Sequence, residues 1–80
     1  MKIPRDVGYE DLINSLKRMG YKISRQSGSH IRLSAKIKGK THHITIPAHN
    51  PIKIGTLNAI LSELSEVLEI PKNELIEKLF

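Results

Sequence analysis

Apolar and polar residues alternate strictly in the stretch HIRLSAKI, residues 30–37, and no other feature of the sequence constrains the fold as strongly. A period of two places successive side chains on opposite faces of a β-strand. The stretch THHITI, residues 41–46, also places isoleucines on one face, and Lys38-Gly39 between the two stretches suits a tight turn because glycine accepts a positive φ. The two stretches therefore predict an antiparallel hairpin.

The position of the turn also predicts the register of this hairpin. A turn centred on residues 38–39 pairs residues whose numbers sum to 77, and this register places His30 opposite Pro47. The loop that contains His49 follows directly after this point. We therefore expect His30 and His49 to lie at the same end of the sheet.

Helical patterns flank the predicted strands. Apolar residues recur at helical spacing over residues 9–19, where Asp6 can cap the start and Gly20 can end the helix. A second apolar stripe runs over residues 57–68, and IPKNELIEKLF, residues 70–80, suits a short third helix. These patterns predict one helix before the hairpin and two after it.

The first strand is predicted in YKISRQ, residues 21–26, between the first helix and the hairpin. Its alternation places Ile23 on the apolar face and Lys22, Ser24 and Gln26 on the polar face. The sequence SGS that follows breaks the alternation and predicts the connection to the next strand.

Together the elements predict an α+β fold with the order helix, three antiparallel strands, helix and short helix, in a single domain of residues 1–80. Both long helices must bury their apolar stripes on the apolar sheet face, so the polar face is left open. That face has cations and imidazoles with hydroxyls between them, which suits contacts with phosphates and sugars, although a merely solvated basic face has the same composition. Its predicted residues are Lys22, His30, Arg32, Lys36 and His43.

The charge distribution favours a polyanionic partner. The formal net charge is +5, but residues 1–54 hold eleven lysines and arginines against three acidic residues, or +8, whereas residues 55–80 hold two against five glutamates, or −3. A basic surface of this kind favours nucleic acid above other partners. A chain of 80 residues buries only about 60% of the surface that it exposes when unfolded, so we expect any chemistry in a shallow groove.

Several functional classes are excluded or disfavoured by what the sequence lacks. It has no cysteine, which excludes disulfides and thiolate metal sites. The opening MKIPRDVGYE lacks the apolar run that a signal peptide or a membrane span requires. We therefore expect a cytoplasmic protein that has no membrane partner.

Two motifs resemble those of a known family. GSH opens the second predicted strand, and IPAHNPIKIGTLNAIL leads from the third strand into the second long helix, while DLINSLKRMGYKI matches the family's first helix. The chain resembles the HicA toxin family, also called YcfA-like, over nearly its whole length. The resemblance implies a double-stranded-RNA-binding-domain-like fold and an mRNA interferase, the toxin of a HicA/HicB type II system, which cleaves mRNA and is held inactive by a HicB-like antitoxin.

The resemblance also implies the roles of particular residues. His30 matches the histidine of the family's glycine-serine-histidine motif and is therefore the expected catalytic residue. His49 falls in the proline-x-histidine loop, and Gly55 and Thr56 fall at the start of the second long helix. We expect no cofactor and no metal ion.

The residue chemistry is compatible with these roles. Histidine, with an ordinary pKa of about 6.5, suits proton transfer at neutral pH. Ser29 can hold a phosphate oxygen, and His49 is a candidate for a second proton-transfer group, although a loop histidine that only braces the turn has the same pattern. We expect His42 to point inward, as a hydrogen-bonded, half-buried histidine or as a sheet-edge residue. The residues expected to bind RNA are Lys22, Arg32, Lys36, His43, Lys53, Gly55 and Thr56.

Three other hypotheses fit parts of the sequence. Four histidines within twenty residues suggest a metal site, but no carboxylate between residues 12 and 62 completes a conventional ligand set. A non-catalytic RNA-binding module on the same fold would need the cations but not His30. An interaction domain that docks a partner through the leucines of the C-terminal segment would bind without marked salt dependence, unlike either RNA-binding hypothesis.

Overall fold

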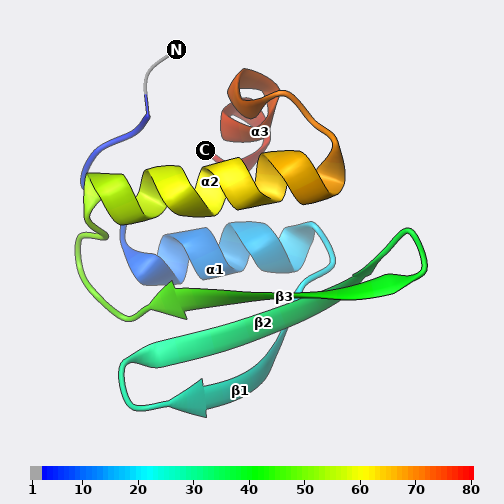
Figure 1. The fold of residues 1–80 in the computed structure, drawn as a ribbon. Coiled ribbons are helices and arrows are strands. Elements are labelled where there is room, and N and C mark those ends of the chain that lie inside the picture. The colour runs from blue at the N-terminus through cyan, green and yellow to red at the C-terminus, as the bar shows by residue number, and fades with distance from the viewer. Residues whose placement is uncertain (1–2) are drawn as a thin grey trace.

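The computed structural model describes residues 3–80, which form one helix, three strands and two further helices in chain order (Figure 1). The elements are α1 (Tyr9–Arg18), β1 (Lys22–Ser27), β2 (His30–Ile37), β3 (Lys40–Pro47), α2 (Ile54–Leu68) and α3 (Lys72–Leu79). The predicted α+β class, the order of the elements and the short C-terminal helix are confirmed.

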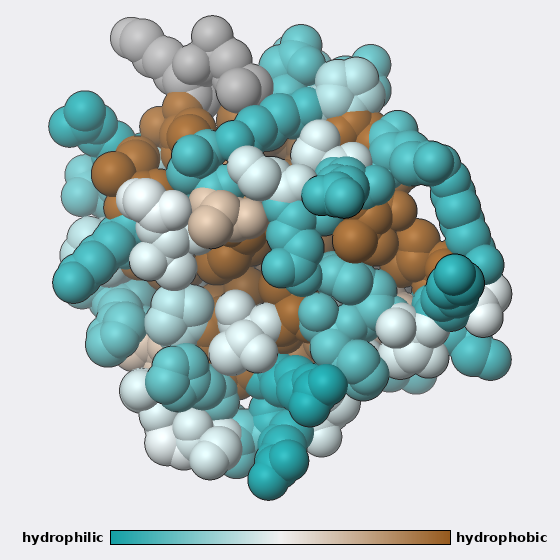
Figure 2. All heavy atoms as spheres, viewed as in Figure 1, coloured by the Kyte–Doolittle hydropathy of each residue, from teal (hydrophilic) through white to brown (hydrophobic). Residues whose placement is uncertain are grey.

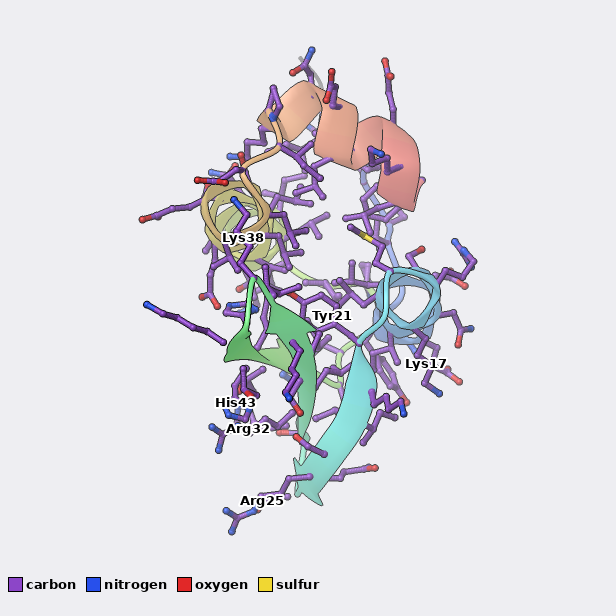
Figure 3. All side chains as sticks on the ribbon, turned by 90° about the vertical axis from the view of Figure 1, so that its right-hand side faces the viewer. Lys17, Tyr21, Arg25, Arg32, Lys38 and His43 are labelled. Atoms are coloured by element: carbon purple, nitrogen blue, oxygen red, sulfur yellow. The ribbon has the colours of Figure 1, made fainter. Side chains whose placement is uncertain are left out.

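The strands form one antiparallel sheet in the order β1-β2-β3, with the helices of residues 3–80 on one side of it (Figure 1). Seen along the helices, α1 and α2 lie side by side over the sheet, and α3 lies beyond them on the side away from the sheet (Figure 3). One apolar core joins these layers, and its fully buried members include Leu12, Leu33, Ile46, Leu61 and Leu75. In Figure 2 hydrophilic residues predominate over the lower part of the molecule, where the strands lie.

The β2–β3 hairpin has the predicted register. All of its paired residues have numbers that sum to 77, and His30 lies opposite Pro47. Lys38 and Gly39 form the turn with φ values of 53° and 80°. Two consecutive positive φ values match the twist of the flanking strands, which explains why glycine is needed in this tight turn.

β1 departs from the predicted alternation because it contains a β-bulge. Ile23 and Arg25 pair with consecutive residues of β2, so Ser24 has no partner of its own. Beyond this extra residue, Arg25 lies on the face away from the helices, which we call the outer face, and Gln26 lies on the inner side. The prediction that Gln26 lies on the polar face was therefore wrong, because a bulge shifts the face of every residue that follows it.

The start of α1 also differs from the prediction, because Asp6 does not cap the helix. Gly8 occupies the N-cap position, and the side-chain amide oxygen Oδ1 of Asn50 accepts the Tyr9 backbone N–H at 3.2 Å. A Cβ atom at position 8 would lie 3.0 Å from this Asn50 oxygen, so glycine is favoured there. A distant loop thus supplies the acceptor that a local capping residue usually provides.

The helix α3 is anchored by apolar packing and by one buried hydrogen bond. Leu75 and Leu79 are buried among α1 and α2, as the predicted apolar side requires. The Ser15 hydroxyl of α1 donates to the Leu79 carbonyl at 2.7 Å, which satisfies a carbonyl in the last turn of α3. This short helix is therefore part of the core rather than an appendage.

Candidate active site

The outer face of the sheet is built from cross-strand rows of basic and hydroxyl side chains. One row contains Arg25, Arg32 and Thr45, and the next contains Ser27, His30 and Pro47. Arg25, Arg32 and His43 project away from the helices in Figure 3. None of the three strands contains an aspartate or a glutamate, so the whole face is electropositive. An anionic ligand is the partner that this face would attract.

An open pocket of about 370 Å³ lies at one end of this face, where β2 begins and β3 ends. It is formed because the β2–β3 register brings His30 next to the end of β3, and the loop after β3 then turns back toward α2. The Ala48 N–H donates to the Ser29 carbonyl at 2.6 Å and so holds this loop against the start of β2. The residues that line the pocket are His30, Thr45, Pro47, His49, Lys53 and Thr56.

The loop that carries His49 is tied to the rest of the fold at several points. Its Ile52 N–H donates to the Val7 carbonyl at 2.8 Å, and the Ile52 side chain is buried in the core. Asn50 of the same loop binds the start of α1. These contacts restrict the loop, so the position of His49 relative to His30 is set by the fold and not by a free loop.

The start of α2 also borders the pocket, beside the strands and the loop that carries His49. Lys53 is at the N-cap position, and the first turn of α2 contains no acidic residue and no side-chain cap hydrogen bond. The first N–H groups of a helix have no partner within the helix and carry partial positive charge. Together with the Lys53 ammonium, this helix end favours a negatively charged group in the pocket.

The structure therefore brings together four of the residues singled out in the sequence: His30, His49, Lys53 and Thr56. Ser29 is exposed in the β1–β2 turn next to His30, and Gly55 is exposed in the first turn of α2. The remaining predicted RNA-binding residues lie elsewhere on the outer face. These are Lys22, Arg32, Lys36 and His43.

Two residues of the outer face were missed as site residues. Thr45 lies between the two isoleucines of THHITI and lines the pocket, so the alternation of β3 already contained the signal for it. Arg25 reaches the outer face only because of the bulge at Ser24, and a regular alternation places it on the other side. No periodic signal in the sequence would have found Arg25.

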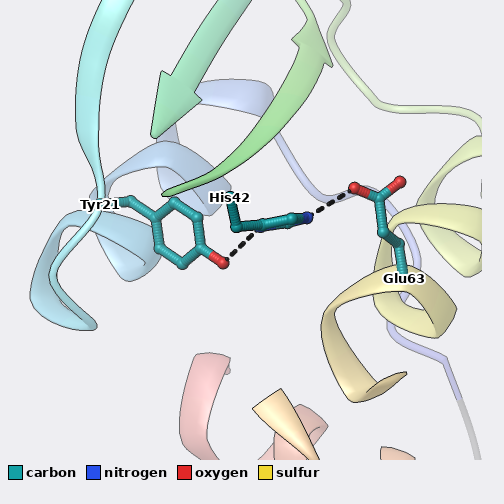
Figure 4. A network of polar contacts seen from close by, with 3 residues as sticks. All are labelled: Tyr21, His42 and Glu63. Atoms are coloured by element: carbon teal, nitrogen blue, oxygen red, sulfur yellow. Dashed lines mark hydrogen bonds and ion pairs between the residues drawn. The ribbon is translucent and has the colours of Figure 1, made fainter. Parts of the chain in front are cut away.

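The inward-pointing His42 joins a polar network at the opposite end of the sheet (Figure 4). Its Nε2 lies 2.8 Å from Oε2 of Glu63, and its Nδ1 lies 2.8 Å from the Tyr21 hydroxyl. A carboxylate only accepts hydrogen bonds, so Nε2–H donates to Glu63 and, in the neutral ring, Nδ1 accepts from the Tyr21 O–H. The expectation of a hydrogen-bonded, inward-pointing His42 is confirmed, and its role here is to connect β3 with α2.

This network predicts how stability depends on pH. Burial, with a smaller contribution from the charge of Glu63, raises the pKa of the Tyr21 hydroxyl above its ordinary value of 10.0. The folded state then holds this proton more tightly than the unfolded state does, so its stabilising contribution is present below about pH 10 and is lost as pH rises further. We expect Tyr21→Phe to lose less stability than wild type between about pH 9 and about pH 11, as measured by urea unfolding.

Tyr9→Phe is the control for this experiment, because it removes the same hydroxyl from the other tyrosine of the chain. It should retain the wild-type dependence on pH. A Tyr21→Phe variant whose stability falls with pH as steeply as that of wild type would disprove the assignment to Tyr21.

The fold and the pocket define a small α+β protein with one face of its sheet covered by helices and the other face basic and open. The chain belongs to the HicA toxin family: the family model described as the HicA toxin of bacterial toxin-antitoxin matches residues 9–65, and α3 lies beyond that match. It is therefore a toxin of a toxin-antitoxin system, a class that acts on RNA and is paired with an antitoxin.

Comparisons with curated proteins and with solved structures found no significant match. Within residues 3–80, no helix has the length and apolar character needed to span a membrane. Over the same residues, no three histidine, cysteine or acidic side chains are grouped so that they could hold a metal ion.

Proposed function

We propose that this toxin is an endoribonuclease that cleaves mRNA without a metal ion, with His30 as its catalytic residue. The observation that carries the proposal is the pocket in which His30 lies with His49, Lys53 and the start of α2, at the end of a basic face. Imidazoles, a cation and free helix N–H groups are the groups that RNA transesterification needs. Because mRNA is the substrate, we place the action of the toxin in the cytoplasm.

The proposed reaction uses the 2′-hydroxyl of the RNA as the nucleophile. Neutral His30 takes the proton from this hydroxyl, and the new bond forms between the 2′-oxygen and the adjacent phosphorus. The bond from phosphorus to the 5′-oxygen then breaks, and protonated His49 gives its proton to the departing oxygen. Lys53 and the N–H groups at the start of α2 stabilise the additional negative charge on the phosphate. The products are a 2′,3′-cyclic phosphate and a 5′-hydroxyl.

The remaining cations of the outer face are proposed to bind the RNA on either side of the pocket. Lys22, Arg32, Lys36 and His43 lie on the same face as His30 and have no acidic neighbour on the strands. Phosphate contacts of this kind position a nucleic acid without reading its sequence. We therefore expect affinity for RNA that falls steeply as the salt concentration rises.

The proposed partner is a HicB-like antitoxin with an acidic surface that covers the pocket and the outer face. The net positive charge of these surfaces supports such complementarity. An antitoxin in this position would exclude RNA by occupying the same cations. It would not need to change the structure of the toxin.

The activity is tested by incubating the purified protein with end-labelled mRNA in excess EDTA. We expect cleavage to continue in EDTA and to leave a 2′,3′-cyclic phosphate, which a phosphatase removes only after the ring is opened. If EDTA abolishes cleavage and added Mg²⁺ restores it, the metal-independent mechanism is wrong.

The proposed role of His49 predicts a specific loss of turnover. We expect His49→Ala to lower kcat by about a hundredfold, a usual loss for a general acid, and to remove the decline of activity at high pH. His43→Ala is the matched control, since His43 is also exposed but lies two rows farther along the sheet from His30, and it should mainly raise KM. An unchanged kcat together with a lower Tm for His49→Ala would instead make His49 a brace for the loop.

A further inference from the structure

Two arginines lie directly opposite each other on the outer face. Arg25 of β1 pairs with Arg32 of β2, and both side chains are exposed. Directly opposed like charges destabilise a pair of strands. Repulsion between the two guanidinium groups therefore lowers the stability of the free protein. We expect a bound anion to relieve this repulsion.

The backbone holds this pair in place through the bulge. Ser24 is the extra residue of the bulge, and its hydroxyl donates to the Arg32 carbonyl at 3.2 Å. The bulge returns Arg25 to the outer face, so that Arg25 and Arg32 extend from the same side of the sheet in Figure 3. Bulges commonly re-aim a side chain next to a functional site.

No acidic side chain on the strands neutralises these two arginines. Within residues 3–80, the ion pairs join Lys38 to Glu69 and His42 to Glu63, and neither pair includes Arg25 or Arg32. Two guanidinium groups side by side offer forked donors that match the oxygens of one phosphate. We therefore expect a bound ligand to supply the negative charge that neutralises Arg25 and Arg32.

We propose that Arg25 and Arg32 form a clamp for one backbone phosphate of the RNA, adjacent to the phosphate that is cleaved at His30. This proposal rests on the proposed nuclease function for the identity of the ligand. Arg32 and His30 are two residues apart on β2, a distance of about 6.6 Å along a strand, which is close to the separation of neighbouring phosphates in an extended single strand. Thr45 lies opposite Arg32 and also lines the pocket, so the clamp and the pocket adjoin.

The clamp makes Arg25 a positioning residue, which would hold the RNA so that the next phosphate lies at His30. The alternative is that Arg25 only protects the exposed edge of β1 from pairing with other chains, a common use of charged residues on edge strands. Under that alternative, replacing Arg25 should lower RNA affinity only as much as removing any other single positive charge from the sheet. The two explanations are therefore separated by a charge-matched comparison.

The test compares Arg25→Gln with Lys40→Gln. Each variant removes one charge from an exposed position of the sheet, but Lys40 lies beside the β2–β3 turn, at the far end of β3 from the pocket. The probe is a short 2′-O-methyl oligouridine, which cannot be cleaved because its 2′-oxygen is blocked. We expect Arg25→Gln to weaken binding about tenfold and to reduce the slope of log affinity against log salt by about 0.7, and Lys40→Gln to change affinity less than about twofold.

Equal losses in the two variants would overturn the clamp. Arg25→Lys keeps the charge but not the fork, so wild-type affinity in this variant would also overturn it. The Tm of Arg25→Gln should equal or exceed that of wild type, because an unfavourable charge pair is removed. A failure of the nuclease proposal is seen separately, as a wild-type protein that binds the oligonucleotide but does not cleave mRNA. In that case phosphate binding by Arg25 and Arg32 would stand, but the positioning role of Arg25 at His30 would fall.

Discussion

Replacement of His30 by alanine should lower the rate of mRNA cleavage by about a thousandfold or more, with RNA affinity changed by less than about threefold. His30 is exposed at the start of β2 and lines the pocket, so its loss removes a proton-transfer group without opening a cavity in the core. The outer-face cations remain in the variant, so we expect RNA still to bind. Activity and affinity should therefore separate in this variant.

The measurement records cleavage and binding for the same preparations of wild type and His30→Ala, in EDTA and at several salt concentrations. Tight, salt-sensitive binding by both proteins without cleavage by either would leave a non-catalytic RNA-binding module as the better account. Binding of a protein partner that does not weaken with salt, without RNA binding, would favour an apolar docking domain. Cleavage by both proteins would assign the chemistry to another residue.

Replacement of Leu75 by alanine should lower the free energy of unfolding by about 2 to 5 kcal/mol. Leu75 is fully buried where α3 packs on α2 and α1, although α3 lies beyond the residues that the family model matches. Its truncation removes buried apolar surface and leaves a cavity that the surrounding helices cannot fill without moving. Because small domains are stable by only about 5 to 15 kcal/mol, this is a large fraction of the total.

Urea unfolding of wild type and Leu75→Ala measures this loss, with Phe80→Ala as the control. Phe80 is larger but 46% exposed at the end of α3, so its truncation should cost much less. If Leu75→Ala does not fold, Leu75→Val gives a smaller change at the same site. Equal stability of Leu75→Ala and Phe80→Ala would show that α3 contributes little to the core.

The features that the sequence predicted correctly are the ones that depend on neighbouring residues. The alternation of β2 and the glycine of the turn were enough for the register of the hairpin, and this register put His30 at the end of the sheet that leads to His49. Apolar stripes were likewise enough for the helices. In each case the physical cause lies within a few residues of the effect.

The features that the sequence did not predict depend on one-residue or long-range effects. The bulge at Ser24 changes the face of Arg25. A strand with a bulge has only one residue more than a regular strand, so the apolar and polar pattern of so short a segment does not reveal it. Asn50 replaces the expected Asp6 at the start of α1, and the two residues are far apart in the chain. Glu63 binds His42 across 21 positions, a distance at which no periodic pattern carries information.

The bulge in β1 also bears on how this surface can evolve. Because Ser24 is the unpaired extra residue, its deletion would leave Lys22 and Arg25 paired with the same residues of β2 and on the same face. Insertions and deletions at this point therefore need not disturb the hairpin of β2 and β3 or the core beneath it. Selection can alter the length and bend of the edge strand, and with it the shape of the outer face, while the pocket around His30 stays as it is.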